Sequence, residues 1–392
     1  MMKIFKKMLT VLLLMPLAAH ADWSLIELNK SRVAGGDLIE YGSIAINNSG
    51  EVLVYNNGSP FVIDSDISSI TRLGTSMSAT EINDSGQVAG WFNVIPDIYS
   101  PHVFITNHNG SMIDLGDFGQ PISPGFGVID INNSGQLIVN TRPFTGPYHA
   151  YLTGPNGVGI TELKSSFLSE YSAAYVSVNG INDHGQIVGI DYGHPFITGP
   201  NGAGRTYLST FDDIRDPRFI DVNNSGQVIG NNMVNVDRDY ESAFVTGPDG
   251  IGITDLGTLG GRFSYSYDIN DSGEVVGYST TATGDRHSFL FSHGGMTDLS
   301  LLDIVVEAGL RDIFVLDIND NGQMVGYGIN EYRQTEYFIL SYTPDTIFTP
   351  QSIFIPSSLP PPPIPEPETY AMLLAGLGLI GYMVRRRNKL AI

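Results

Sequence analysis

The sequence predicts an all-β protein: a seven-bladed β-propeller with four strands in each blade, closed by a strand from the N-terminus. Three observations favour this fold class: a turn phrase that occurs seven times, two further strand-like segments after the copies, and one strand displaced to the start of the chain. Helical periodicity is nearly absent, and the one candidate helix lies around residues 301–308.

The turn phrase consists of a β-branched residue, Asn, Asn or Asp, any residue, Gly, and Gln or Glu. Successive copies are 36, 49, 50, 41, 47 and 49 residues apart, measured between the leading asparagines Asn47, Asn83, Asn132, Asn182, Asn223, Asn270 and Asn319. A repeat of this length is typical of a solenoid, a propeller or an array, in which no unit folds alone.

Each copy of the phrase joins two segments that have the composition of β-strands. An alternating or β-branched stretch precedes it, as in residues 262–269, and an apolar run follows it, as in residues 274–278. Two strands around a short Asn/Asp-x-Gly segment indicate a β-hairpin. The glycine suits a turn position with positive φ, and the Asn and Asp side chains are suited to bonding backbone amides within the turn.

Two more strands follow in each unit. One is centred on an aromatic residue, and its seven copies begin at Pro60, His102, His149, His194, Ser242, His287 and Glu336. The other ends in a polar residue and Leu, and its six internal copies begin at Ser69, Ser111, Gly159, Gly204, Gly252 and Gly295. Four strands in about 45 residues is the size of one propeller blade.

The missing seventh copy of the last strand is at the other end of the chain, in SLIEL from Ser24. An N-terminal strand that completes the last blade accounts for this mismatch. It also removes an exposed sheet edge, which would otherwise favour aggregation. A solenoid has no use for a displaced strand, so the propeller is the favoured architecture.

The segments HSFLFSHGGMTDL from His287, DLGTLGG from Asp255 and INDSGEVVGY from Ile269 resemble the bacterial HAF-type extracellular repeat. The resemblance extends roughly from Trp23 to Tyr342. The first unit lacks the His and the Gly before the aromatic residue, and the third has Val139 in place of that Gly. The resemblance implies an exported protein of repeated β units and brings no assigned activity.

The N-terminus has the features of a secretory signal peptide. Three lysines precede an apolar run over residues 8–17, and the small residues Ala19 and Ala21 flank His20 in a cleavage site. The run is too short to remain as a transmembrane segment. We expect the mature protein to begin at Asp22, after passage through the secretion machinery.

The C-terminal tail combines three elements. A proline-rich stretch leads into a Pro-Glu-Pro motif, and an apolar segment over residues 370–384 is followed by a basic cluster. This order predicts an extended spacer, a short membrane helix and a positive flank on the cytoplasmic side. The sorting motif is Pro365, Glu366 and Pro367, and the membrane-flanking basic cluster is Arg385, Arg386 and Arg387.

The run PEPETYAMLLAGLGLIGYMVRRRNK resembles the PEP-CTERM sorting signal. In that family an exosortase recognises the tail in the inner membrane and cuts near the motif. Its bearers are Gram-negative bacteria that make exopolysaccharide, and the substrates reach the cell surface or the biofilm matrix. The resemblance therefore implies an exosortase-type partner and transient residence in the inner membrane. An ordinary single-pass anchor is the alternative.

Four domains follow: a signal peptide at 1–21, a repeat β-propeller at 22–343, a Pro-rich linker ending in the motif at 344–367, and the sorting segment at 368–392. The chain has no cysteine, so its stability depends on the core. Residues 22–364 hold 13 of the 20 basic and 39 of the 41 acidic residues, a difference of −26. Such a charge excludes nucleic acid and anionic lipid as partners.

The two phrases that begin at Asp268 and Asp317 are candidates for metal binding. They place oxygens at alternate positions before a Gly, as a calcium loop does at its start. Val276 and Val325 occupy the position of a further acidic ligand, and no bidentate Glu follows. Because the turn requires Asn and Asp in any case, no metal or cofactor is predicted, with calcium as the alternative.

Catalytic residues are not predicted either. His102, His149, His194 and His287 share one position of the repeat, which indicates packing or hydrogen bonding in every blade. No nucleophile motif or phosphate loop occurs. The repeat symmetry is broken at residues 211–219 and 235–241, where carboxylates and arginines alternate. These are ordinary loop charges or, alternatively, groups for acid–base work on a glycosidic bond.

The sequence thus predicts a non-enzymatic protein of the cell surface or extracellular matrix. It would bind exopolysaccharide or surface proteins through loops at one face of the propeller. The alternative is a secreted glycan-processing enzyme on the same scaffold.

Overall fold

The computed structural model describes residues 22–28, 44–56, 59–94, 101–107, 110–118, 127–142, 148–166, 176–208, 214–234 and 241–343. These residues form 28 strands, four short 3-10 helices and one α-helix within one compact unit. The predicted signal peptide, linker, sorting motif and basic cluster lie outside the described residues. Within those residues, no helix has the length and apolar character that crossing a membrane requires.

The strands form seven groups of four, here called group 1 to group 7. Five groups are separate four-stranded sheets, and groups 5 and 6 share an eight-stranded sheet through one parallel pair, Glu241 with Phe263. Groups 1 and 2 contain β2 (Ile44–Ile46), β3 (Val52–Asn56), β4 (Ser59–Ile63) and β5 (Ile70–Arg72), then β6 (Met77–Ile82), β7 (Val88–Phe92), β8 (His102–Thr106) and β9 (Met112–Gly116).

Groups 3 and 4 contain β10 (Gly127–Ile131), β11 (Leu137–Thr141), β12 (His149–Thr153) and β13 (Ile160–Glu162), then β14 (Val176–Ile181), β15 (Ile187–Asp191), β16 (His194–Ile197) and β17 (Thr206–Tyr207). Groups 5 and 6 contain β18 (Ile214–Val222), β19 (Val228–Val234), β20 (Glu241–Thr246) and β21 (Ile253–Asp255), then β22 (Gly260–Ile269), β23 (Val275–Thr281), β24 (Arg286–Ser292) and β25 (Gly295–Asp298).

Group 7 contains β26 (Arg311–Ile318), β27 (Gln323–Ile329) and β28 (Thr335–Thr343), and its fourth strand is β1 (Asp22–Leu28). β1 pairs antiparallel with β28 over seven residue pairs, from Asp22 opposite Thr343 to Leu28 opposite Tyr337. The expected use of the N-terminal strand as a sheet neighbour of the last repeat is therefore confirmed.

Short helices occur only in the connections of the described part of the chain. The 3-10 helices η1 (Pro155–Gly157), η2 (Pro200–Gly202) and η3 (Pro248–Gly250) join third and fourth strands. The connection from group 6 to group 7 contains η4 (Leu299–Leu301) and α1 (Asp303–Glu307), which agrees with the helix expected around residues 301–308. The expectation of a loop at 211–219 was wrong in part, because β18 already begins at Ile214 and pairs with β19.

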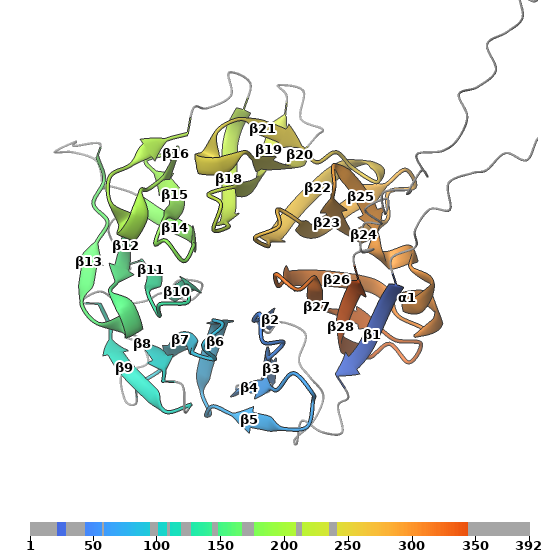
Figure 1. Cartoon of the computed structure of the whole chain (residues 1–392), viewed down its shortest axis with the longest axis horizontal. Helices are drawn as coiled ribbons and strands as arrows, with labels where there is room; N and C mark the ends of the chain where they lie inside the picture. Colours follow the sequence, from blue (N-terminus) through green and yellow to red (C-terminus); the bar gives the residue numbers. More distant parts are fainter. Residues whose placement is uncertain are drawn as a thin grey trace, which may run out of the picture. The chain divides into compact units, whose positions relative to one another are not determined.

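The groups are arranged around a common centre, with the first strand of each group nearest to it (Figure 1). The core is divided into seven hydrophobic clusters, and each cluster is shared between two neighbouring groups. One of them packs Leu28, Val325 and Ile339 of group 7 against Ile44 and Val52 of group 1. Because each group buries its faces only against neighbours, no group has a core of its own.

A glycine in the second strand makes room for the aromatic residue of the third. A Cβ on Gly277 would lie 1.9 Å from the carbonyl oxygen of Tyr265 and 2.9 Å from Cζ of Phe289, which is fully buried. In the third group Val139 replaces the glycine, and its partner Tyr151 is 9% exposed. This repeat therefore departs from the sequence pattern and still buries its aromatic residue, in the cluster shared by groups 2 and 3.

Deletion of β1 tests how much the N-terminal strand contributes. Without it, β28 loses its ladder partner and the cluster at Leu28 is opened, so we expect a loss of stability on the order of several kcal/mol. Thermal unfolding followed by circular dichroism measures the effect. The control is Ile26→Ser, because Ile26 is 43% exposed. An unchanged midpoint after the deletion would contradict the role assigned to β1.

Candidate functional site

The inner turn of each group is built by its leading asparagine. In group 2, the backbone N–H of Gly86 donates to the Asn83 carbonyl at 2.9 Å, and Gly86 has a φ of 71°. The Asn83 side-chain oxygen accepts from the backbone N–H groups of Gln87 at 2.9 Å and Ser85 at 3.1 Å. The predicted hairpin turn, its positive-φ glycine and its side-chain-to-backbone bonds are confirmed.

The same asparagines also bond from one group to the next. Each side-chain Nδ2 donates to the backbone carbonyl of the leading asparagine in the following group, at 2.9–3.2 Å, and this relation links Asn47, Asn83, Asn132, Asn182, Asn223, Asn270, Asn319 and Asn47 again. The leading asparagines are buried. We call this series the asparagine ring.

A second series runs through the residue that follows each leading asparagine. The backbone N–H of each such residue donates to the side-chain Oδ1 of its counterpart in the next group, at 2.7–2.8 Å, through Asn48, Asp84, Asn133, Asp183, Asn224, Asp271 and Asp320. Along this series Asn and Asp alternate. Because the number of groups is odd, the alternation fails once, and Asp271 and Asp320 are neighbours. Burial, with the charges of Asp271 and Asp84, raises the pKa of Asp320.

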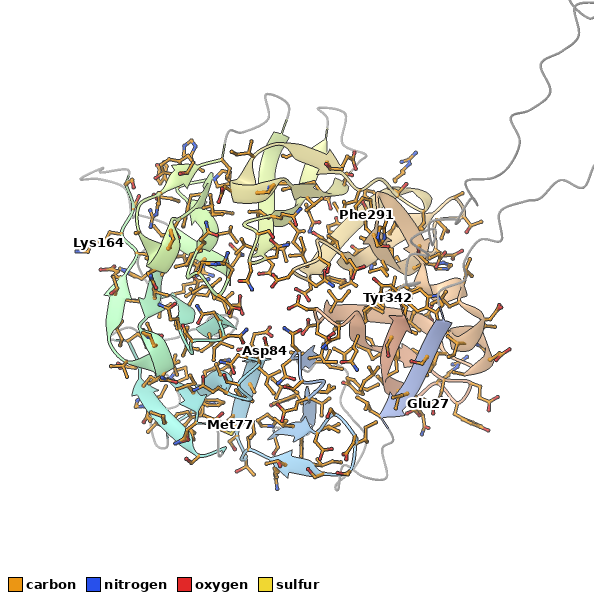
Figure 2. All side chains as sticks on the ribbon, in the orientation of Figure 1. Glu27, Met77, Asp84, Lys164, Phe291 and Tyr342 are labelled. Atoms are coloured by element: carbon orange, nitrogen blue, oxygen red, sulfur yellow. The ribbon has the colours of Figure 1, made fainter. Side chains whose placement is uncertain are left out.

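Figure 2 shows Asp84 at the inner edge of the ring of sheets and Lys164 at the outer edge. The inner turns line a cavity of about 180 Å³, and a second cavity of about 230 Å³ adjoins it. The two share Glu81, Asp268 and Asp317 as lining residues, so we treat them as one central channel.

Five acidic residues face this channel. Each immediately precedes the β-branched residue of its turn phrase, and together they are Glu81, Asp130, Asp221, Asp268 and Asp317. Three of them connect neighbouring groups: Asp130 accepts from the backbone N–H of Ile181 at 2.9 Å, and Asp268 and Asp317 accept in the same way from Ile318 and Ile46. No Lys, Arg or His is among the described residues that line either cavity.

Burial and the nearby charges perturb the titration of four of these acids. Burial raises the pKa of Asp130 to about 6, against two backbone hydrogen bonds that lower it. Burial also raises the pKa of Glu81, Asp221 and Asp317, and in each case the charges of neighbouring channel carboxylates add to the effect. The channel therefore favours cations over anions, and the charged groups among its described lining residues are all carboxylates.

The oxygens of the calcium-like phrase are used within the protein. Asp268 accepts from the backbone N–H groups of Ile269 and Ile318, and Asn270 Oδ1 accepts from those of Ser272 and Glu274. Among the described residues, no group of three or more His, Asp or Glu side chains is placed to hold one metal ion.

The repeated histidines pair with the fourth strand. His102 lies 2.9 Å from Asp114, His149 lies 2.7 Å from Glu162, and His287 lies 2.8 Å from Asp298. His194 instead packs edge-on against Tyr207, with ring centroids 6.2 Å apart. In other groups a Ser–Arg or Ser–Asp pair stands at the same place. These contacts join the third and fourth strands, as the repeat position predicted.

Several predicted sites fall outside the described residues: the signal cleavage residues Ala19 and Ala21, the sorting motif at 365–367 and the basic cluster at 385–387. Residues 235–240 are also outside them. The sequence interpretation missed both hydrogen-bond series and the convergence of the channel acids. The sequence does hold a signal for the convergence of the channel acids: an acidic residue precedes the β-branched position in five of the seven phrases.

A family description of the PEP-CTERM protein-sorting motif matches residues 363–387, which confirms the resemblance of the tail. No curated protein matches the chain. The HAF-type resemblance stays a prediction from the sequence.

Several solved structures are similar to this chain, and one of them is described as a β-propeller domain. The β-propeller domain of the Trilobed protease from Pyrococcus furiosus, described as having an open velcro topology, has 9% identity and a TM-score of 0.51, covering 79% of this chain and 97% of that one. A prolyl endopeptidase has 12% identity and a TM-score of 0.50, covering 79% and 47%. A puromycin hydrolase mutant has 9% identity and a TM-score of 0.47, covering 74% and 50%.

The chain thus spans about half the length of the endopeptidase and hydrolase chains. At these identities the likeness bears on the fold alone, which is all-β and propeller-like.

The asparagine ring can be tested with a pair of asparagines in similar turns. Asn330, in the β27–β28 turn, accepts from Tyr332 and Gln334 like a leading asparagine, but among the described residues its amide nitrogen donates within its own group, to Glu336. Asn132 makes the turn bonds and also donates to Asn182. We expect Asn132→Ala to cost about 2 kcal/mol more than Asn330→Ala in denaturant unfolding, because it leaves buried groups unpaired. Equal costs would contradict the ring's contribution.

The channel acids predict how stability depends on pH. Because folding raises the pKa of Glu81, Asp130, Asp221 and Asp317, the folded state keeps protons that the unfolded chain releases between about pH 4 and 6. The free energy of unfolding should therefore fall as pH rises through this range, with a thermal midpoint several degrees higher at pH 5 than at pH 8. Glu81→Gln should flatten the slope, whereas the exposed control Glu331→Gln should not. A rising midpoint would refute this account.

Proposed function

We propose that the protein is exported, sorted through its C-terminal tail by an exosortase-type enzyme, and delivered to the surface or extracellular matrix of a Gram-negative bacterium. There it acts as a non-enzymatic binding protein for exopolysaccharide or surface proteins. The observation that carries the proposal is the sorting motif over residues 363–387. The signal peptide before Asp22 and the short apolar segment at 370–384 agree with it.

The binding domain is, in this proposal, a closed seven-bladed propeller of HAF-type repeats. Three features support closure: the pairing of β1 with β28, the cluster shared by groups 7 and 1, and the hydrogen bond from Asn319 back to Asn47. A closed ring suits an extracellular environment without disulfides because it leaves only short, protected sheet edges.

A binding role is supported over catalysis by the histidine pairs. The histidine–carboxylate pairs recur in three groups, as expected of structural links. The alternative is a glycan-processing enzyme. Incubation with the host's own exopolysaccharide separates the two: binding without new reducing ends supports the proposal, and sustained release of reducing ends supports the enzyme.

Sorting should depend on the Pro-Glu-Pro motif. Changing Pro365, Glu366 and Pro367 together to Ala removes the distinctive part of the signal, so we expect the protein to accumulate in the inner membrane. The matched control changes residues 360–362, three prolines of the spacer outside the matched segment, to Ala. The measurement is fractionation of the native host. If the motif variant reaches the surface as wild type does, the exosortase route is wrong.

A further inference from the structure

The connection between groups 6 and 7 departs from the repeat. It contains α1, the one α-helix among the described residues, and it leads into an irregular start of β26. The register of β26 against β27 shifts between Arg311 and Phe314, and Asp312 has a φ of 47°. An extra residue of this kind redirects side chains at a strand end, and such irregularities concentrate beside functional sites.

A cleft of about 580 Å³ lies at this place, within the range of about 300–1,000 Å³ that is typical of small-molecule sites. Its lining comes from β24, the connection and β26, and includes Arg286, His287, Ser300, Leu310, Arg311 and Phe314. None of its lining residues lines the central channel. β24 and β26 both begin here, so the cleft lies at the strand ends opposite the asparagine turns.

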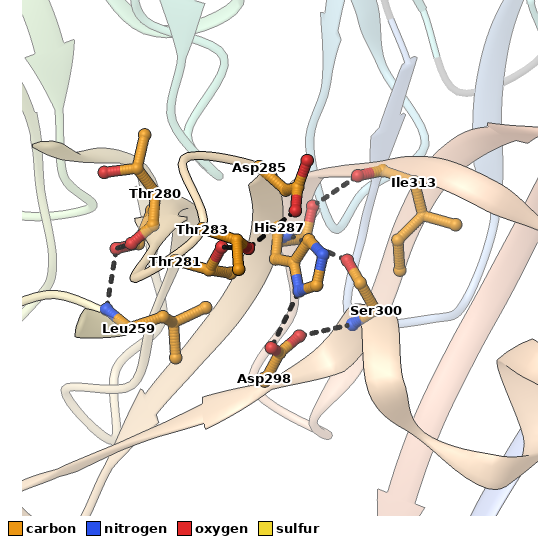
Figure 3. Close-up of polar contacts among 11 residues, drawn as sticks. Leu259, Thr280, Thr281, Thr283, Asp285, His287, Asp298, Ser300 and Ile313 are labelled. Atoms are coloured by element: carbon orange, nitrogen blue, oxygen red, sulfur yellow. Dashed lines mark hydrogen bonds and ion pairs between the residues drawn. The ribbon is translucent and has the colours of Figure 1, made fainter. Parts of the chain in front are cut away.

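The polar groups of the cleft are held in place by neighbours outside it (Figure 3). His287 Nδ1 lies 2.8 Å from Asp298, whose other oxygen accepts from the Ser300 backbone N–H at 3.0 Å. His287 is thereby oriented through Nδ1, and its Nε2 takes no part in this pair. Arg286 lies over the ring of Tyr278 at 5.5 Å, and Tyr278 stacks on Tyr265 at 4.8 Å. These contacts restrict the side-chain conformations of His287 and Arg286, so the binding of a ligand costs less conformational entropy.

The lining combines balanced charges with an apolar wall. Arg286 and Arg311 are matched in number by Asp285 and Asp312, and Val306, Leu310 and Phe314 provide apolar surface. Val306 is 58% exposed. A pyranose suits such a cleft, because its hydroxyls both donate and accept hydrogen bonds and its C–H face packs on an aromatic ring. An anionic ligand would pair only with the arginines of the cleft, and a cationic ligand only with its aspartates.

We propose that this cleft binds a pyranose unit of an uncharged polysaccharide. The inference rests on the proposed binding role and assigns it to the end of groups 6 and 7 away from the asparagine turns. His287, Ser300, Arg286, Arg311 and the two aspartates hold hydroxyl groups, and Phe314 supports the ring face.

Binding can be measured by affinity electrophoresis of the full-length protein in mild detergent, in gels that contain dextran, laminarin or hydroxyethylcellulose as uncharged polymers and alginate as a charged one. The variants are Arg311→Ala and Val306→Asp, both at exposed positions. The matched control is Arg333→Ala, an exposed arginine in the β27–β28 turn of group 7, on the same end of the strands and outside the cleft. Thermal midpoints confirm that all variants fold.

We expect wild type and Arg333→Ala to bind at least one uncharged polymer equally, and both cleft variants to bind it at least tenfold more weakly. If the cleft variants bind like wild type, the assignment to this cleft is wrong while the binding role stands. Binding of alginate alone, lost in Arg311→Ala, would overturn the uncharged ligand. If wild type binds none of the polymers, both the cleft assignment and the polysaccharide-binding role fail.

Discussion

The side chain of the leading asparagine makes the contacts on which the rest of this architecture depends. Its oxygen accepts backbone N–H groups inside its own turn, and its amide nitrogen donates to the next group, so one buried side chain both shapes a hairpin and sets the position of its neighbour. Only an amide provides both roles at this distance, since a carboxylate lacks the donor and Ser lacks the reach. Because no group has its own hydrophobic core, such contacts decide how seven marginal units become one domain.

The channel follows from the same constraint. Turns that converge on one centre bring together whatever residue precedes the phrase, and in five groups that residue is acidic. These carboxylates also accept backbone N–H groups of the next group, so they stabilise the contact between groups while they repel one another. Burial, together with this repulsion, raises the pKa values of Glu81, Asp130, Asp221 and Asp317. Because the number of groups is odd, there is a second such conflict, between Asp271 and Asp320: the backbone N–H of Asp271 donates to the Asp320 carboxylate while the two side-chain charges repel.

Much of the fold could be predicted from the sequence because it depends on local chemistry. Asn, Gly and flanking β-branched residues define each hairpin. The strand sequence that begins at Ser24 has the pattern of a fourth strand, which predicts that β1 completes the last group. The bond from Asn83 to Asn132 could not be predicted, because a side chain's partner 49 residues away depends on how the groups pack. The cleft could not be predicted either: Arg286 and Arg311 come together only through α1 and the irregular start of β26. Tail signals are linear motifs, so the sequence sufficed for them.

The central claim is that the inner turns act as one hydrogen-bonded ring. Native-state hydrogen exchange of backbone amides tests it directly, because the second turn residues, from Asn48 to Asp320, donate their N–H groups to side chains of the next group. The account predicts that these amides all exchange with one common free energy, equal to that of global unfolding. If they exchange with separate free energies, group by group and well below that of global unfolding, the ring does not hold the domain together.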